Sequence, residues 1–216
     1  MSSTLTLVNV DAINGAGVER EPYSYFTAQS FLQPAAIEAV RNEFPAITKT
    51  GYHPADEIEL SSTFKKLIEE LESPELTAAL SAKFGIDLSP FPRLTTIRKL
   101  SANHEGRIHC DSKSKVMTML VYMNDDWGSA DGRLRVLYNR NDMDKYKLEV
   151  SPQMGSIFAF LRADDSWHGH TPFTGERRVV QIAWVRSNDE LLRKKKRARF
   201  TNMLKGWFGK DQKKAA

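Results

Sequence analysis

The sequence predicts an α+β protein that is mainly β, on three observations. From Leu94 onward, about eight short segments of β type follow one another, separated by turn residues. No helical pattern lies between these segments, as parallel βαβ units would require. Residues 1–90 instead carry apolar residues at helical spacing, with capping residues before them. This order favours a double-stranded β-helix, or jelly-roll, core with N-terminal helices packed on one sheet.

The N-terminal helices are predicted from their end signals. Ser61 or Ser62 is a candidate cap for one helix, and Ser73 for the next, which Gly85 would end. Pro45 marks the end of an earlier apolar pattern of helical spacing. In order, we expect a strand over residues 5–10, a loop over 11–21, and helices over 34–44, 63–71 and 74–84.

The strands of the core are predicted from apolar segments bounded by Gly, Pro, Asn, Asp and Ser. Their number suits two antiparallel sheets facing each other, and residues 139–145 are polar enough for an exposed hairpin loop. The expected strands cover residues 94–100, 107–111, 115–124, 133–139, 146–150, 156–161, 166–172 and 177–185.

Composition is typical of an ordinary soluble globular protein. The 216 residues suffice for one well-buried domain, with 41% hydrophobic and 27% charged residues. Cys110 is the single cysteine, which excludes an internal disulfide and fits a reducing compartment. The first ten residues lack the features of a secretory signal, and no apolar run is long enough to span a membrane. We therefore expect a cytoplasmic protein.

Candidate metal ligands stand near both ends of the strand-rich half. His109 and Asp111 are two positions apart, so in a strand both side chains point to the same side while Cys110 faces away. A second histidine, His168, follows far along the chain. Two histidines and one carboxylate are the ligand set that holds Fe(II) and leaves other positions open.

The chain resembles the Fe(II)- and 2-oxoglutarate-dependent oxygenases, and within them the prolyl 4-hydroxylase-like branch. The resemblance rests on His109-x-Asp111, on residues 122–127 (Tyr-Met-Asn-Asp-Asp-Trp), on residues 132–136 (Gly-Arg-Leu-Arg-Val) and on residues 168–184. It covers roughly the second half of the chain, and residues 22–45 carry a weaker likeness to the N-terminal part of similar bacterial enzymes.

This resemblance implies the cofactors and the reaction. His109, Asp111 and His168 would be the catalytic iron ligands, with Fe(II) as the metal, 2-oxoglutarate and O₂ as cosubstrates, and ascorbate as a candidate reductant. The implied reaction is hydroxylation of an unactivated C–H bond, with succinate and CO₂ as co-products. The substrate stays open: a prolyl residue of a protein or peptide, a sugar or glycan, or another small molecule.

Two alternatives concern neighbouring pairs of residues. The spacing of the family favours His168 over His170 as third ligand, and His170 is then expected to orient a substrate or pack near the metal. Arg177 and Arg178 are both candidates to bind 2-oxoglutarate, because the family places this arginine nine or ten residues after the histidine. If Trp184 corresponds to the inward-facing tryptophan of the family, Arg178 is the arginine that faces the pocket.

Other polar residues are weaker candidates for a role in the site. Tyr122 matches the tyrosine that donates its hydroxyl to the same carboxylate of the cosubstrate. His104 and Arg107 lie in the loop before the first ligands, where the family often contacts substrate, although both also fit an ordinary exposed loop. His53 is expected to be an ordinary exposed residue, and Cys110 is expected to fill core space rather than to act as a nucleophile.

The basic charge is concentrated at the C-terminus. From residue 186 on, eleven Lys and Arg oppose three acidic residues, a net +8 (11 − 3), which leaves −4 (4 − 8) for the rest of the chain. Residues 1–187 are expected to form one domain, with helical support over 1–90 and the jelly roll over 91–187. Residues 188–216 would be a basic amphipathic helix and tail, whose apolar stripe is Phe200, Met203, Leu204, Trp207 and Phe208.

Three kinds of binding partner are predicted as alternatives for the C-terminal tail. Through residues 191–208 it would dock on the jelly roll or on a second subunit, or lie on an anionic membrane surface, which would make the protein peripheral at the membrane. Contact with nucleic acid or another polyanion is the least favoured. The rivals to the oxygenase are thus a non-catalytic metal-binding jelly-roll sensor and a membrane or polyanion adaptor that acts through the tail.

Overall fold

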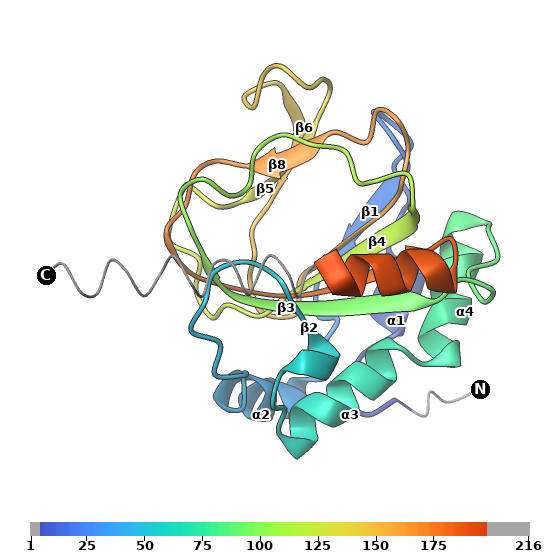
Figure 1. Ribbon diagram of the computed structural model, residues 1–216, viewed down its shortest axis with the longest axis vertical. Helices are drawn as coiled ribbons and strands as arrows, with labels where there is room; N and C mark the ends of the chain where they lie inside the picture. The colour runs from blue at the N-terminus through green and yellow to red at the C-terminus, as the bar shows by residue number, and fades with distance from the viewer. Residues whose placement is uncertain (1–4, 198–216) are drawn as a thin grey trace, which may run out of the picture.

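The computed structural model describes residues 5–197, which fold into two facing sheets with helices on one side (Figure 1). The helical elements are α1 (Asp11–Gly15), η1 (Pro34–Ala36), α2 (Ile37–Asn42), η2 (Ala55–Glu57), α3 (Ser62–Leu71) and α4 (Pro74–Phe84). The strands are β1 (Tyr25–Ala28), β2 (His53–Pro54), β3 (Arg93–Ser101), β4 (Lys115–Tyr122), β5 (Leu134–Leu137), β6 (Tyr146–Val150), β7 (Ile157–Leu161), β8 (His168–His170) and β9 (Gly175–Val185).

The two sheets confirm the predicted jelly-roll architecture. The larger one has six strands in the order β1-β7-β4-β9-β3-β2, and the smaller one has three in the order β6-β5-β8. All of these strand pairs are antiparallel. The last long strand, β9, therefore lies between β3 and β4 in the middle of the large sheet, and its residues can reach both sides of that sheet.

The two faces of the large sheet are buried in different cores. One face packs on the N-terminal helices, and Val180, Ile182 and Trp184 of β9 belong to this helix-covered core. The other face meets the small sheet, and Val179 of β9 belongs to this inter-sheet core. Side chains of a strand alternate between faces, so the odd-numbered residues of β9 point between the sheets and the even-numbered ones toward the helices.

The ends of the supporting helices follow the predicted signals. The Ser61 side chain accepts a hydrogen bond from the backbone N–H of Phe64, and Ser73 accepts one from Leu76. Gly85 ends α4 in the left-handed conformation at φ 71°, which a residue with a side chain adopts only with strain. These local bonds satisfy helix-end groups that would otherwise be unpaired.

Several predicted elements are shorter than expected or replaced. The segment over residues 5–10 forms a single bridge, Val8 with Leu32, because Glu70 takes its N–H groups. Residues 11–15 of the predicted loop form α1, and residues 107–111 form only a bridge between His109 and His168. The strand expected over 166–172 is limited to β8. The short strands β1 and β2 are absent from the prediction.

Residues 188–197 form the start of the predicted C-terminal helix. Lys194 donates to the Ser112 hydroxyl at 2.7 Å, and Lys195 pairs with Asp56 at 2.5 Å, so this helix contacts both the loop that follows Asp111 and the helical support. The predicted apolar stripe from Phe200 to Phe208 lies outside the described residues. Within residues 5–197, no helix is both long and apolar enough to cross a membrane.

Replacing Glu70 with Ala is expected to destabilise the protein by about 3 kcal/mol. The buried Glu70 carboxylate accepts hydrogen bonds from the backbone N–H groups of Thr6, Leu7 and Val8, and from the Thr6 hydroxyl, at 2.8 to 3.0 Å. Its removal would leave these donors without their acceptor, at a cost of roughly 1 to 3 kcal/mol for each buried group. Urea unfolding measures the loss. Glu69→Ala, on the exposed side of the same helix, is the matched control, and equal effects of both changes would contradict the prediction.

Candidate metal centre

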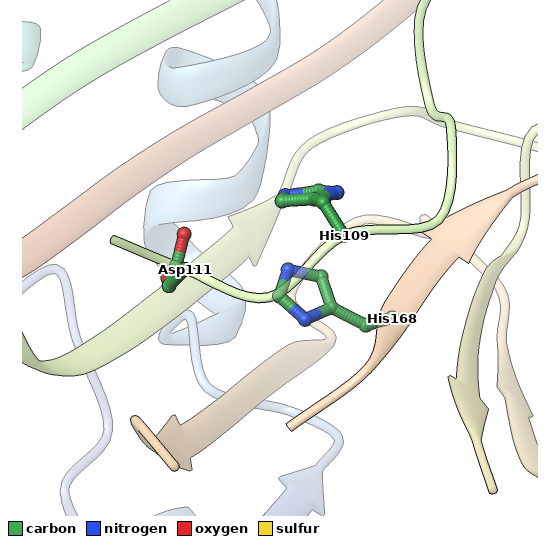
Figure 2. A group of neighbouring side chains, drawn as sticks. All are labelled: His109, Asp111 and His168. Carbon is green, nitrogen blue, oxygen red and sulfur yellow. The ribbon is translucent and has the colours of Figure 1, made fainter. Parts of the chain in front are cut away.

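The three predicted ligands lie together between the sheets. His109, Asp111 and His168 each offer a ligand atom, and these atoms lie within 4.8 Å of one another (Figure 2). A pair of backbone hydrogen bonds between His109 and His168, at 2.9 and 3.0 Å, holds the two histidines opposite each other. Their ring centroids are 4.3 Å apart. The isolated bridge therefore brings residues distant in sequence into one ligand set.

Each histidine is held in the tautomer that a metal ligand needs. Nδ1 of His109 lies 2.9 Å from the Arg107 carbonyl oxygen, and Nδ1 of His168 lies 2.8 Å from the Ser166 carbonyl oxygen. A carbonyl oxygen can only accept, so Nδ1 carries the hydrogen in both rings. The lone pair then resides on Nε2, where it is available to a cation, and the hydrogen bond fixes the ring orientation.

The third ligand, Asp111, is buried in its ionised form. Lys115 Nζ lies 2.8 Å from one carboxylate oxygen, and the Thr118 hydroxyl donates to the other at 2.6 Å. Burial alone would raise the pKa of Asp111, but the Lys115 ammonium and these hydrogen bonds hold it well below its usual range. The carboxylate is thus charged and oriented before any metal binds, and its oxygens keep lone pairs for coordination.

The two buried histidines near the metal site are both expected to be neutral at physiological pH. Burial and the neighbouring His109 lower the pKa of His168 from 6.5 to about 4, against the attraction of Asp111. Burial and the Arg177 guanidinium lower the pKa of His170 from 6.5 to about 3. Only a neutral imidazole binds a metal, so His168 is ready to coordinate without first losing a proton.

The metal-free protein is therefore expected to lose stability as the pH falls below 6.5, the ordinary pKa of a histidine side chain. The unfolded chain would protonate His168 near that pH, whereas the folded protein does so only near 4, so acid favours unfolding throughout this window. The loss from His168 is about 2 kcal/mol at about pH 5. Urea unfolding with a chelator, compared with His168→Gln, checks this. An unchanged pH slope in the variant would contradict it.

A cavity of about 90 Å³ adjoins the ligands. Its wall includes His109 and His168, the apolar side chains Leu120 and Phe160, and Arg177 of β9. Arg177 is 1% exposed, and its Nε donates to the Gly132 carbonyl oxygen at 2.8 Å. Among residues 5–197, no carboxylate forms an ion pair with this guanidinium. A buried cation without a counter-ion is costly, which points to an anionic ligand.

The prediction that Arg178 faces this pocket is wrong. Arg178 points to the helix-covered side, where it pairs with Glu176 at 3.0 Å and lies over the Phe44 ring. Strand alternation does place Arg178 and Trp184 on one face, as expected. However, Trp184 packs in the helix-covered core rather than toward the metal, so Arg177, nine residues after His168 (177 − 168), is the arginine inside.

Tyr122 lies on the pocket side of β4, on the same face as Thr118 and Leu120, which line the cavity. Burial raises the pKa of its hydroxyl, and the nearby Arg177 opposes this rise. The Arg177 guanidinium lies 5.5 Å from the centroid of the Tyr122 ring, and the hydroxyl makes no hydrogen bond of good geometry. A buried hydroxyl in this state is typical of a group that awaits a ligand.

The remaining predicted residues fall into two groups. His170, His104 and Arg107 line a second, wider cavity of about 560 Å³ beside the first. Cys110 points away from the ligands, with Sγ 3.4 Å from the Asp164 carbonyl oxygen, and burial raises the pKa of its thiol. His53 lies in β2, with Nε2 3.2 Å from the Lys49 carbonyl oxygen, and lines neither cavity.

Four residues of the site are missing from the prediction. Lys115 and Thr118 orient Asp111, and Tyr52 and Arg98 line the cavity. Lys115 and Thr118 stand in the strand that follows the first ligands, so their four- and seven-residue spacing from Asp111 was a usable signal. Tyr52 and Arg98 carry no such signal, because only the pairing of β2 and β3 with the sheet brings them to the pocket.

Comparison with known proteins agrees with this donor set. Residues 95–186 match the family model described as the 2OG-Fe(II) oxygenase superfamily. The resemblance to this superfamily that the sequence indicated is thereby confirmed over these residues. Two imidazoles, one ionised carboxylate and a buried guanidinium fit Fe(II) and 2-oxoglutarate, with O₂ as the second cosubstrate. Among curated proteins, no significant match is found.

Solved structures show the same fold. A prolyl-4-hydroxylase from Pseudomonas putida is 18% identical with a TM-score of 0.55, over 83% of this chain and 97% of that one. A prolyl 4-hydroxylase from Phytophthora capsici is 17% identical with a TM-score of 0.54, over 86% of this chain and 67% of that one. At these identities, the likeness concerns the arrangement of the sheets and helices.

Proposed function

We propose that this chain, whose jelly-roll core matches the 2OG-Fe(II) oxygenase superfamily, is a dioxygenase that hydroxylates an unactivated C–H bond, with succinate and CO₂ as co-products. The observation that carries the proposal is Arg177. It is a buried guanidinium that has no counter-ion within the described residues 5–197, and it lies in the same cavity as His109 and His168. A structural metal site has no need of such a group, whereas a dicarboxylate cosubstrate does.

Arg177 and Tyr122 would bind the distal carboxylate of 2-oxoglutarate. The Arg177 guanidinium is fixed through Nε, which donates to Gly132, and its terminal N–H groups are then left for a carboxylate. The Tyr122 hydroxyl is buried beside it and would donate to the same group. Both side chains are positioned in advance, which lowers the entropy lost on binding.

The chain itself binds, orients and excludes water. His109, Asp111 and His168 would hold Fe(II) on one side and leave its other positions for the cosubstrates. When bound, iron and 2-oxoglutarate supply the oxidising chemistry. Leu120 and Phe160 form an apolar wall that limits water near the ligands. Lys115 and Thr118 keep Asp111 ionised and in place.

The candidate substrates are a prolyl residue of a protein or peptide, a sugar or glycan, or another small molecule. The wider cavity beyond His170 is large enough for a peptide segment or a sugar unit, and its walls include polar loop residues as well as Ile108 and Pro172. We propose that the substrate enters from this side, since the wider cavity shares His170 with the metal cavity.

The purified protein with Fe(II), ascorbate and 2-oxoglutarate tests the proposal. We expect slow conversion of 2-oxoglutarate to succinate without substrate, and faster conversion with a substrate found by screening peptides and glycans. Binding of 2-oxoglutarate without succinate under any condition would favour the non-catalytic sensor. If neither binding nor succinate were detected, the oxygenase proposal would have to be given up.

A further inference from the structure

His170 separates two cavities, and it is not needed as a ligand. Its ring lines both the cavity beside His109 and His168, of about 90 Å³, and the wider cavity formed by the loop over residues 103–108 with Met143 and Pro172, of about 560 Å³. A molecule that entered from the wide side to reach the metal would therefore pass along the His170 ring.

The ring of His170 is fixed in one orientation. Nδ1 lies 2.8 Å from the Thr171 carbonyl oxygen, and the backbone N–H of His170 donates to the Gly106 carbonyl oxygen at 2.8 Å. Gly106, at φ +85°, packs directly on the ring, where any Cβ would overlap it. A residue with a side chain at position 106 would therefore be strained and would displace the ring.

The fixed orientation leaves a hydrogen-bond acceptor unused. Because the Thr171 carbonyl can only accept, Nδ1 of His170 carries the hydrogen and Nε2 carries the lone pair. Nε2 is buried, in a residue that is 6% exposed, and has no hydrogen-bond partner among residues 5–197. Buried polar groups are seldom left in this state in proteins, so a ligand is the natural source of the missing donor.

Arg98 offers the complementary donor in the same cavity. Its guanidinium lies over the Tyr52 ring, 4.1 Å from the centroid, and pairs with Glu105 at 3.4 Å. Glu105 compensates its charge, so Arg98 differs from Arg177, which lacks a counter-ion. The Nε–H of Arg98 is nevertheless buried, and the part of the chain that the structure describes offers it no acceptor. Arg98 therefore needs a neutral acceptor rather than an anion.

We propose that His170 and Arg98 form the substrate-binding subsite of this enzyme, and that it takes a neutral polar group with an acceptor for Arg98 Nε–H and a donor for His170 Nε2. A carboxamide or a pair of hydroxyl groups has this chemistry, whereas a carboxylate or phosphate lacks the donor. The inference rests on the proposed oxygenase function and adds the substrate class to it.

The test uses the full chain loaded with Zn(II) in place of iron and saturated with 2-oxoglutarate. NMR with ¹⁵N-labelled histidine should show His170 with hydrogen on Nδ1 and none on Nε2. Titration then uses three probes at millimolar concentration: N-acetylprolinamide, methyl α-glucopyranoside and the anion N-acetylproline. We expect one of the two neutral probes to shift the Nε2 resonance, and which one does so tells an amide from a hydroxyl substrate.

Variants separate this subsite from the cosubstrate site. His170→Phe keeps the ring volume but removes the acceptor, and Arg98→Lys keeps the charge but removes the Nε–H. Each should weaken the neutral probe about tenfold or more, and by a clearly larger factor than it weakens 2-oxoglutarate, which Arg177 holds in the same cavity. His53→Phe, at a residue that lines neither cavity, is the matched control and should bind all ligands normally.

The outcomes distinguish two failures. If 2-oxoglutarate does not bind the wild-type protein, the proposed function fails and takes this inference with it. If 2-oxoglutarate binds, but no neutral probe does, or His170→Phe binds the probe as tightly, only the subsite is wrong. Tighter binding of N-acetylproline than of the neutral probes would also overturn it, because the site would then select an anion.

Discussion

Replacing Asp111 with Ala is expected to abolish metal binding and turnover, with a loss of activity greater than about 100-fold. Loss of a residue that merely orients a ligand already costs about 10- to 100-fold in metal affinity, and Asp111 is itself a ligand and the only charged one. The two histidines alone would hold Fe(II) weakly. Calorimetric titration with Mn(II) and the rate of succinate formation measure the effect.

The controls for this prediction follow from the ion pair that Asp111 makes. Asp111→Ala leaves the buried Lys115 ammonium without a partner, at a cost of about 3 to 5 kcal/mol. The double variant with Lys115→Met removes that cost and should fold while still failing to bind metal. Asp164→Ala, at an aspartate whose side chain is 77% exposed, should behave as wild type. Metal binding by the double variant at wild-type affinity would refute the assigned ligand set.

Replacing Arg177 with Met is expected to weaken 2-oxoglutarate binding by about 100-fold or more and to leave metal binding intact. Truncating one partner of a buried charged hydrogen bond costs about 2 to 5 kcal/mol, and each 1.4 kcal/mol is a factor of ten in affinity. Methionine keeps most of the side-chain length, so the inter-sheet packing is preserved. The Kd for 2-oxoglutarate, measured with Mn(II) present, is the readout.

Arg178→Met is the matched control, because it removes the same charge from the next residue of the same strand. Arg178 contacts Glu176 and Phe44 on the helix-covered side, so the Kd for 2-oxoglutarate should change less than about twofold. The reverse result, with Arg178→Met impaired and Arg177→Met normal, would mean that the cosubstrate does not bind between the sheets at Arg177.

The convergence of His109 with Asp111 and the ends of the supporting helices could be predicted because their signals are local, whereas His168 was selected through the family resemblance. Ser61, Ser73 and Gly85 act within one helical turn, and each is seen where it was expected. His109 and Asp111 converge because their two-residue spacing keeps both on one side of the backbone, even though the segment is a bridge and not a full strand. His168 is paired directly with His109.

The choice between Arg177 and Arg178 could not be made from local sequence signals. Alternation in β9 determines that Arg178 shares a face with Trp184 and that Arg177 lies on the other. It does not determine which face meets the small sheet and which meets the helices, because both are buried and both are lined by apolar residues. Only the packed structure shows that Trp184 belongs to the helix side.

The sequence by itself determined the two-sheet fold, the helix ends and the convergence of His109 with Asp111, because caps, strand alternation and a two-residue spacing are properties of short stretches of chain. Tertiary structure alone decided that Arg177 enters the pocket, that His168 lies opposite His109, and that Arg98 and His170 line the same cavity. These contacts depend on which strands become neighbours and on which side the helices cover, and burial then fixes their strength by excluding water.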